Sequence, residues 1–275
     1  MRHFWQHAAR FLTFYFSANT RFQVHSPFVF ELVTNVLEDR RWYYAFRDVE
    51  AIRGNMLDST VVLDVADYGA VSINPAPMRR TVPLRRLARV SASSAGQGRR
   101  LFRLANWLKP RRVLELGTSV GVGAMYLASA VRDAMFISLE GSEACAHVAR
   151  ANLGILNLHR HTEVVVGPFH QTLQPALRAL GKVDLAFFDG HHLKMPTLEY
   201  FEEVLEHTHE RSVLVFDDIY WSAEMTAAWE QIRQHPRVTL TVDCFDLAFV
   251  FVNPDFKVKQ HFRLVPVSWK PWKIW

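Results

Sequence analysis

The chain has 275 residues, 49% of them hydrophobic and 21% charged, and a net charge of +5. This composition favours one large or two small globular domains with a full hydrophobic core. No apolar run reaches the roughly 18–20 residues of a membrane span, and the first 16 residues lack the apolar stretch and cleavage site of a signal peptide. Cys145 and Cys244 are expected to be buried free thiols, so a cytoplasmic location is predicted.

Basic residues are concentrated between positions 79 and 112, where eleven Arg and Lys occur without an Asp or Glu. Solvated helix faces are one explanation, because their long charged side chains lie over apolar surface. The other explanation is an anionic substrate or a nucleic acid that binds near this segment.

The first 90 residues are predicted to be mainly helical. Apolar residues three and four apart indicate an amphipathic helix over 3–16. Ser26 and Pro27 are typical of a helix start, with serine at the N-cap and proline in the first turn. Further elements are expected as a helix over 43–56, a strand over 61–65 and a short basic helix over 83–90.

Small residues fill positions 91–98, which we expect to form a loop, and a helix is predicted over 99–108. Beyond it, apolar strands alternate with helices, which predicts right-handed βαβ units and a parallel sheet. The expected strands are 113–117, 134–140, 162–166, 183–189 and 212–217, and the helices that follow them are 122–131, 142–154, 170–180, 195–207 and 222–234.

The end of the chain breaks this alternation. Segments 238–242 and 247–252 are too close together for parallel pairing, so they are expected to form an antiparallel hairpin. The predicted fold class is α/β, with a Rossmann-like sheet of five parallel strands plus this closing hairpin and with helices on both faces. Residues 254–275 form a basic, aromatic tail that packs on the core or covers a pocket or a partner.

Ligands of open α/β sheets bind beyond the carboxyl ends of the strands. Acidic residues end four of the five parallel strands, at Glu115, Glu140, Asp189 and the pair Asp217 and Asp218. A carboxylate at such a place costs desolvation energy unless it has a partner. We therefore expect these acids to bind a ligand.

A nucleoside is the expected ligand of Glu140. This acid lies 23 residues after Gly117, a spacing suited to holding both ribose hydroxyls. NAD and S-adenosylmethionine both meet that requirement. The turn reads Gly117-x-x-x-Gly121 instead of G-x-G-x-x-G, and the closing hairpin differs from the dehydrogenase sheet, so S-adenosylmethionine is favoured.

Four segments carry a family resemblance: residues 113–128 (VLELGTSVGVGAMYLA), 91–98, 183–192 (VDLAFFDGHH) and 213–221 (VLVFDDIYW). They resemble the first motif, the segment over the methionine end of the cofactor, and the fourth- and fifth-strand motifs of class I S-adenosylmethionine-dependent methyltransferases. The resemblance is closest to the subfamily of catechol, caffeoyl-CoA and macrocin O-methyltransferases. It covers about residues 91–253, which implies a Rossmann-like methyltransferase sheet.

The resemblance implies a role for each residue of the cofactor site. Glu115 and the two glycines of the turn would shape the methionine end, and Glu140 would bind the ribose. This chain has Gly123 where catechol-type enzymes carry a serine, so a backbone N–H would have to hold the cofactor carboxylate. The set implied for the cofactor is Glu115, Gly117, Thr118, Ser119, Gly121, Gly123, Glu140, Gly167, Phe169 and Asp189, with Gly167 and Phe169 flanking the adenine.

The resemblance also implies a divalent cation and a base. Asp189, Asp217 and Asp218 match the positions that hold a metal in metal-dependent members, and carboxylate oxygens suit Mg²⁺. His192 aligns with the basic lysine of the catechol type, and histidine suits general-base work near neutral pH. Asp189 and His192 are the expected catalytic residues. In the alternative interpretation, His191 and His192 simply cap or solvate the start of the next helix.

The implied function is transfer of a methyl group to a hydroxyl of a small molecule, which the basic segment suggests is anionic. Residues 91–253 would form the catalytic domain, and residues 1–90 with the tail would form the acceptor region. An RNA methyltransferase that uses the basic segment 79–112 is an alternative, although no RNA-binding module precedes the core. A non-catalytic S-adenosylmethionine-binding scaffold is another, and a homodimer is compatible with each.

Overall fold

The computed structural model describes residues 2–68, 78–90, 93–270 and 272. These residues form two compact units, which we name by their place in the sequence. The central unit is Arg41–His191, and the flanking unit consists of Met1–Arg40 and His192–Trp275. The boundaries expected at residues 90 and 253 concern function, which the packing of the chain does not test, so they stay predictions.

Four parallel strands form the sheet of the central unit. Strand β3 (Arg112–Leu116) pairs with β4 (Met135–Glu140) on one side and with β6 (Leu185–Phe188) on the other, and β5 (Thr162–Val166) pairs with β4. All four residues of β6 are buried, as expected for a strand covered on both faces. The parallel βαβ arrangement is thus confirmed. The helices that connect these strands are α6 (Val122–Ala130), α7 (Glu143–Ile155) and α8 (Phe169–Leu180).

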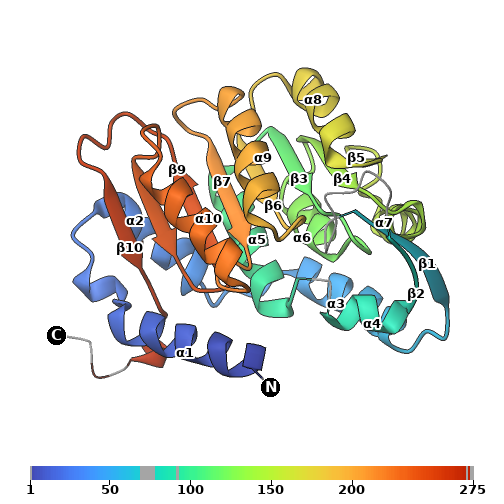
Figure 1. Cartoon of the computed structure of the whole chain (residues 1–275), viewed down its shortest axis with the longest axis horizontal. Helices are drawn as coiled ribbons and strands as arrows, with labels where there is room; N and C mark the ends of the chain where they lie inside the picture. Colours follow the sequence, from blue (N-terminus) through green and yellow to red (C-terminus); the bar gives the residue numbers. More distant parts are fainter. Residues whose placement is uncertain (1, 69–77, 91–92, 271, 273–275) are drawn as a thin grey trace. The chain divides into compact units, whose positions relative to one another are not determined.

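The central unit begins with a segment that the sequence predicted only in part. Strand β1 (Val62–Asp67) was expected, but its antiparallel partner β2 (Met78–Pro83) was not. Most of β2 is exposed, so its sequence lacks the apolar alternation that identifies a strand. Figure 1 shows this hairpin beside α7. Helix α3 (Tyr44–Leu57) precedes the hairpin, and α4 (Leu84–Val90) follows it.

Helix α5 (Ala95–Leu108) starts four residues earlier than expected. The hydroxyl of Ser94 accepts a hydrogen bond from the backbone N–H of Gln97, and the Gln97 side chain accepts one from the N–H of Ser94. This capping box fixes the start of the helix. The prediction of a loop was therefore wrong over residues 95–98, because the two glycines there concealed a helical turn. Residues 91 and 92 of that loop lie outside the described residues.

The flanking unit holds the closing hairpin. Strand β9 (Leu247–Phe251) is antiparallel to β7 (Val213–Asp217) and to β8 (Leu240–Asp243), which confirms the hairpin. An additional strand, β10 (Gln260–Arg263), pairs in parallel with β8. All eight expected strands, including β1, are therefore present, and β2 and β10 were missed. The helices of this unit are α1 (Arg2–Ser17), α2 (Pro27–Leu32), α9 (Lys194–Glu206) and α10 (Ala223–Gln234), with short helical turns at Arg21–Gln23, Val33–Leu37 and Val267–Trp269.

The aromatic tail packs against α1 within the flanking unit. The phenol of Tyr15 donates a hydrogen bond to the carbonyl oxygen of Trp269 at 2.8 Å, and the rings of Phe11 and Trp269 are 6.0 Å apart. The ammonium group of Lys270 donates to the carbonyl oxygen of Ala18 at 2.7 Å and lies over the Tyr15 ring. The tail thus packs on α1 around Lys270, which is buried, while Trp269 stays partly exposed.

Both cysteines are buried free thiols, as the sequence predicted. Across the described part of the chain, no helix combines the length and the hydrophobicity that a membrane crossing requires.

Candidate functional site

The turn after β3 depends on two glycines. Gly117 has a φ of 106°, and a Cβ on it would overlap the carbonyl oxygen of Asp189. Gly121 has a φ of 87°, and a Cβ there would lie 3.0 Å from Ala149 of α7. A side chain at either position would be strained and would collide with backbone. The glycines therefore let the turn approach the β6 loop and let α6 pack against α7.

Glu115 is buried under this turn, with 1% of its surface exposed. The hydroxyl of Ser138 donates to Glu115 Oε2 at 2.5 Å, and the hydroxyls of Ser138 and Thr118 are also hydrogen-bonded. Burial raises the pKa of Glu115 to about 8, because a low-dielectric environment disfavours the charged form. Ser138 was not among the residues expected at the site, because its only sequence signal is a polar residue within the apolar strand β4.

Glu140 ends β4 with both carboxylate oxygens fixed by backbone N–H groups. Ser119 N–H donates to Oε2 at 2.7 Å, and Ser142 N–H donates to Oε1 at 2.8 Å. These two hydrogen bonds therefore orient the carboxylate beside the turn.

The residues expected to flank an adenine lie next to the Asp189 loop. Gly167 has a φ of 143°, and its N–H donates to the carbonyl oxygen of Glu140 at 2.9 Å. A Cβ on Gly190 would lie 2.8 Å from the Phe169 ring, and the rings of Phe169 and His191 are 6.2 Å apart. The central unit thus brings together the ends of β4, β5 and β6 around the turn.

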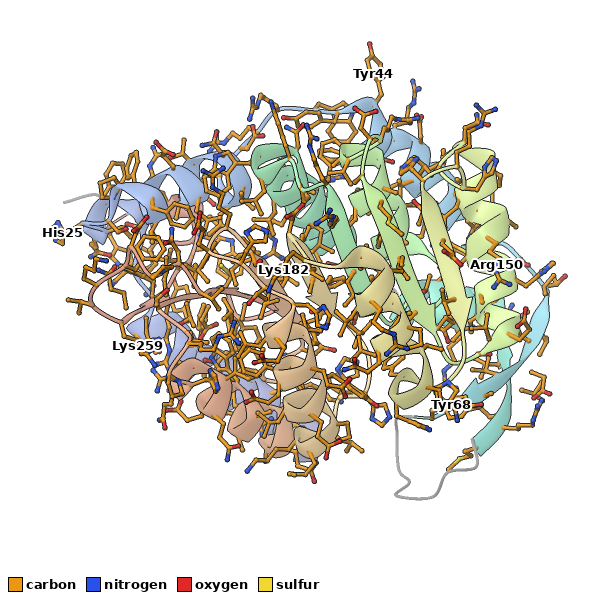
Figure 2. All side chains as sticks on the ribbon, turned by 90° about the horizontal axis from the view of Figure 1, so that it is seen from above. His25, Tyr44, Tyr68, Arg150, Lys182 and Lys259 are labelled. Atoms are coloured by element: carbon orange, nitrogen blue, oxygen red, sulfur yellow. The ribbon has the colours of Figure 1, made fainter. Side chains whose placement is uncertain are left out.

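The β1–β2 hairpin reaches the same edge. Ala66 N–H donates to the hydroxyl of Ser142 at 3.3 Å. A Cβ on Gly141 would lie 2.7 Å from the ring of Tyr68, which Figure 2 shows where β1 ends. Tyr68 therefore lies against the residue that follows Glu140, a contact that the sequence did not indicate.

Helix α3 supports the segment before α5 through a buried arginine. Arg53 is 9% exposed, and its guanidinium donates to the carbonyl oxygens of Ala88 and Ser93. It also pairs with Glu50, which accepts a hydrogen bond from the phenol of Tyr126 at 2.7 Å. Arg53, Glu50 and Tyr126 of α6 therefore form a chain of polar contacts that holds the backbone at Ser93.

Asp217, Asp218 and His192 all lie in the flanking unit. Asp217 ends β7 with 5% of its surface exposed, and its Oδ1 accepts a hydrogen bond from the N–H of Asp218 at 2.9 Å. The pKa of His192 is lowered from its ordinary value by burial, and the charge of Asp218 partly offsets this shift. The pKa of Asp218 is raised from its ordinary value by burial, and the charges of His192 and His7 partly offset this shift. An imidazole and a carboxylate thus influence each other at this strand end.

The three aspartates of the predicted metal site are divided between the two units. Asp189 belongs to the central unit, whereas Asp217 and Asp218 belong to the flanking unit. Within the described ranges, no group of three or more His, Cys, Asp or Glu side chains is placed to hold a metal ion. The metal ligands therefore stay a prediction.

Several arginines of the basic segment 79–112 have partners within the chain. Arg79 forms an ion pair with Asp64 at 2.9 Å, and the guanidinium of Arg99 lies 4.9 Å from the centre of the Trp42 ring. These contacts favour the structural explanation of the segment over a nucleic-acid surface.

Residues 114–219 match a family model described as a methyltransferase domain. The chain is 37% identical over 129 residues to a catechol O-methyltransferase of Mycobacterium tuberculosis and 29% identical over 128 residues to one of Niastella koreensis. Each match covers 46% of this chain and 57% of the relative. The chain therefore spans little more than half the length of the curated relatives it matches.

Solved structures share the fold. A methyltransferase of Podospora anserina bound to S-adenosylhomocysteine is 18% identical, with a TM-score of 0.57 over 79% of this chain and 91% of that one. An O-methyltransferase of Bacillus cereus in complex with S-adenosylhomocysteine is 22% identical, with a TM-score of 0.51 over 81% and 96%. Residues 114–219 therefore resemble a methyltransferase domain, the chain is similar in sequence to catechol O-methyltransferases over part of its length, and it shares the fold of solved methyltransferases.

Proposed function

We propose that this chain transfers the methyl group of S-adenosylmethionine to a hydroxyl group of a small molecule. The observation that carries the proposal is the 37% identity to a catechol O-methyltransferase over 129 residues. Glu115 and Glu140, near the ends of the neighbouring strands β3 and β4, support it. S-Adenosylmethionine and S-adenosylhomocysteine are bound in solved structures with the same fold.

In the proposed cofactor site, the two acids recognise different parts of the molecule. Glu140 accepts hydrogen bonds from the ribose hydroxyls, and its backbone-held carboxylate needs no reorientation. Glu115 accepts a hydrogen bond from the ammonium group of the methionine moiety. The remaining contacts come from residues of the turn and of the β5 and β6 loops, namely Gly117, Thr118, Ser119, Gly121, Gly123, Gly167, Phe169 and Asp189.

The proposed reaction is a direct displacement. The acceptor hydroxyl loses its proton to His192, and the oxygen attacks the sulfonium methyl carbon while the carbon–sulfur bond breaks. The products are the methyl ether, S-adenosylhomocysteine and a proton on His192. Asp189 follows β6, where its N–H is held by the carbonyl oxygen of Leu116 at 2.8 Å, and it positions the acceptor. Holding the reactants in line supplies much of the acceleration.

A divalent cation is part of the proposal. Asp217 and Asp218 are adjacent carboxylates at a strand end, and hard oxygen donors of this kind fit Mg²⁺. Together with Asp189 they would hold the ion. When bound, the cation would lower the pKa of the acceptor hydroxyl.

An activity screen tests the function. Phenols, sugars and acyl carriers with free hydroxyls, including anionic members of each class, are incubated with the protein and methyl-labelled S-adenosylmethionine, with Mg²⁺ or with chelator. We expect label in at least one hydroxyl acceptor, and loss of transfer with chelator, in Asp217→Ala/Asp218→Ala and in His192→Ala. Cofactor binding without transfer to any acceptor would favour a scaffold. Full activity with chelator and in the double variant would show that the reaction does not use a divalent cation.

The RNA alternative has its own measurement. Filter binding of RNA at two salt concentrations would reveal salt-sensitive affinity if the basic segment bound phosphates. The expected result is no such affinity, because arginines of that segment are engaged within the chain. Sedimentation of the intact chain tests the homodimer.

A further inference from the structure

Ser93 places a buried hydroxyl beside the candidate cofactor site without a protein partner. Its surface is 4% exposed, and among the described residues its Oγ has no hydrogen-bond partner. A buried hydroxyl without a partner costs free energy. Such a group at a ligand site indicates that the ligand supplies the partner.

The hydroxyl lies at the start of α6. Its Oγ is 3.3 Å from the position that a Cβ on Gly123 would occupy, and Glu115 Oε1 is 2.8 Å from the same position. Gly123 belongs to the first turn of this nine-residue helix, whose N-cap, Gly121, contributes no side-chain hydrogen bond. A hydrogen-bond donor, a carboxylate oxygen and the unpaired N–H groups of a helix start therefore converge at one point.

We propose that the Ser93 hydroxyl binds the α-carboxylate of the methionine moiety of S-adenosylmethionine, an inference that rests on the proposed function. The start of α6 favours a negative charge, and the hydroxyl donates one hydrogen bond to it. Glu115 Oε1, next to the hydroxyl, accepts the ammonium group of the same amino acid. The two groups together match the two charges of an α-amino acid.

This assignment explains Gly123. Catechol-type enzymes carry a serine at that position, and the resemblance alone implied that a backbone N–H holds the carboxylate in this chain. Here the hydroxyl comes from Ser93 instead, and a side chain at position 123 would be crowded, because its Cβ would lie 2.8 Å from Glu115 Oε1. Arg53 is a positioning residue, because it holds the carbonyl oxygen of Ser93 in place.

A pair of ligands that differ only in the carboxylate tests the proposal. Affinities for S-adenosylhomocysteine and for its decarboxylated analogue are measured by calorimetry with the intact chain, with Ser93→Ala and with Ser129→Ala. Ser129 lies at the far end of α6 and controls for loss of a serine from the same region. A hydrogen bond to a charged group is lost in Ser93→Ala, so we expect its affinity for S-adenosylhomocysteine to fall about tenfold or more. Its affinity for the decarboxylated analogue is expected to stay unchanged.

Thermal unfolding of the ligand-free variant adds a second readout. Removal of an unpaired buried hydroxyl leaves the melting temperature of Ser93→Ala unchanged or higher. An equal loss of affinity for both ligands, or a lowered melting temperature, would assign Ser93 a structural role and overturn the inference. Unchanged affinity for S-adenosylhomocysteine would overturn it as well, and in each case the proposed function would stand. If the unchanged protein binds neither ligand, the proposed function itself fails.

Discussion

The backbone N–H of Asp189 donates a hydrogen bond to the carbonyl oxygen of Leu116 at 2.8 Å, one residue before the glycine turn. The carbonyl oxygen of Asp189 then occupies the space where a Cβ on Gly117 would lie. The loop that carries a proposed catalytic acid and the turn that is proposed to hold the methyl donor are thus in direct backbone contact. A change at one is expected to displace the other.

Replacing Gly117 with alanine is expected to lower the free energy of unfolding by about 2 kcal/mol or more, because the new methyl group meets fixed backbone at a positive φ. Urea unfolding measures the loss. Gly154→Ala is the matched control, since nothing lies within 4 Å of its Cβ position and it lies in helix α7. Alanine there should be neutral or stabilising. Equal effects of the two changes would show that the contact with Asp189 does not constrain the turn.

Glu115 makes the stability of the ligand-free protein depend on pH. Its pKa is about 8 in the folded protein and 4.5 ordinarily. Between these values the folded state keeps a proton that the unfolded state has lost, so this group's contribution to the free energy of unfolding falls as pH rises, by up to about 1.4 kcal/mol per pH unit. The free energy of unfolding is measured in urea at pH 5.5 and 7.5. Relative to the unchanged protein, Glu115→Gln should be more stable at pH 7.5 than at pH 5.5. The exposed control Asp64→Asn should show no such trend.

Ligand binding should release a proton from the same residue. At pH 7 the Glu115 carboxyl is mostly protonated without ligand, and an ammonium group beside it favours the ionised form. Calorimetry of S-adenosylhomocysteine binding in buffers with different ionisation enthalpies measures the number of protons released. We expect a substantial fraction of one proton with the unchanged protein and less with Glu115→Gln. The same proton release in both would place its source elsewhere.

The contact between Gly141 and Tyr68 can be tested with a double-mutant cycle. A methyl group on Gly141 would lie 2.7 Å from the Tyr68 ring, so Gly141→Ala is expected to destabilise the protein. In the Tyr68→Ala background the same change should cost less, because the ring is gone. We expect a coupling energy of about 1 kcal/mol from urea unfolding. Additive effects would mean that the hairpin does not press on the loop after Glu140.

The sequence predicted those parts of the fold whose residues are buried in a regular pattern. Strands β3 to β7 are apolar runs, and the short link between β8 and β9 allowed only antiparallel pairing. Strand β2 was not predicted because most of its side chains are exposed, and β10 was not predicted because its side chains are exposed or half-buried. A strand is predicted from the spacing of its apolar residues, which are apolar because they are buried. A strand at the surface has few such residues, so its sequence does not identify it.

The candidate site divides in a similar way. Glu115, Glu140 and Asp189 follow recognisable strands, so their neighbourhood within the central unit could be expected. Ser138 and Tyr68 could not, because a single serine or tyrosine has no periodic signal and its contacts depend on the tertiary fold. For Ser93 the resemblance indicated the segment, 91–98, but not that its hydroxyl is buried. Their importance becomes visible only when distances and burial are known.

The pairing of the two ends of the flanking unit has a consequence for how the chain is made. Asn19 exchanges backbone hydrogen bonds with Arg263 and Val265, and the ammonium group of Lys270 binds the carbonyl oxygen of Ala18. The central unit is a single stretch of chain, so it can fold on the ribosome while the rest is being synthesised. Helix α1, although it is translated first, has to wait for β10 and Lys270 to emerge before its final contacts exist. Until then, Phe11 of α1 lacks the Trp269 ring against which it packs in the folded unit.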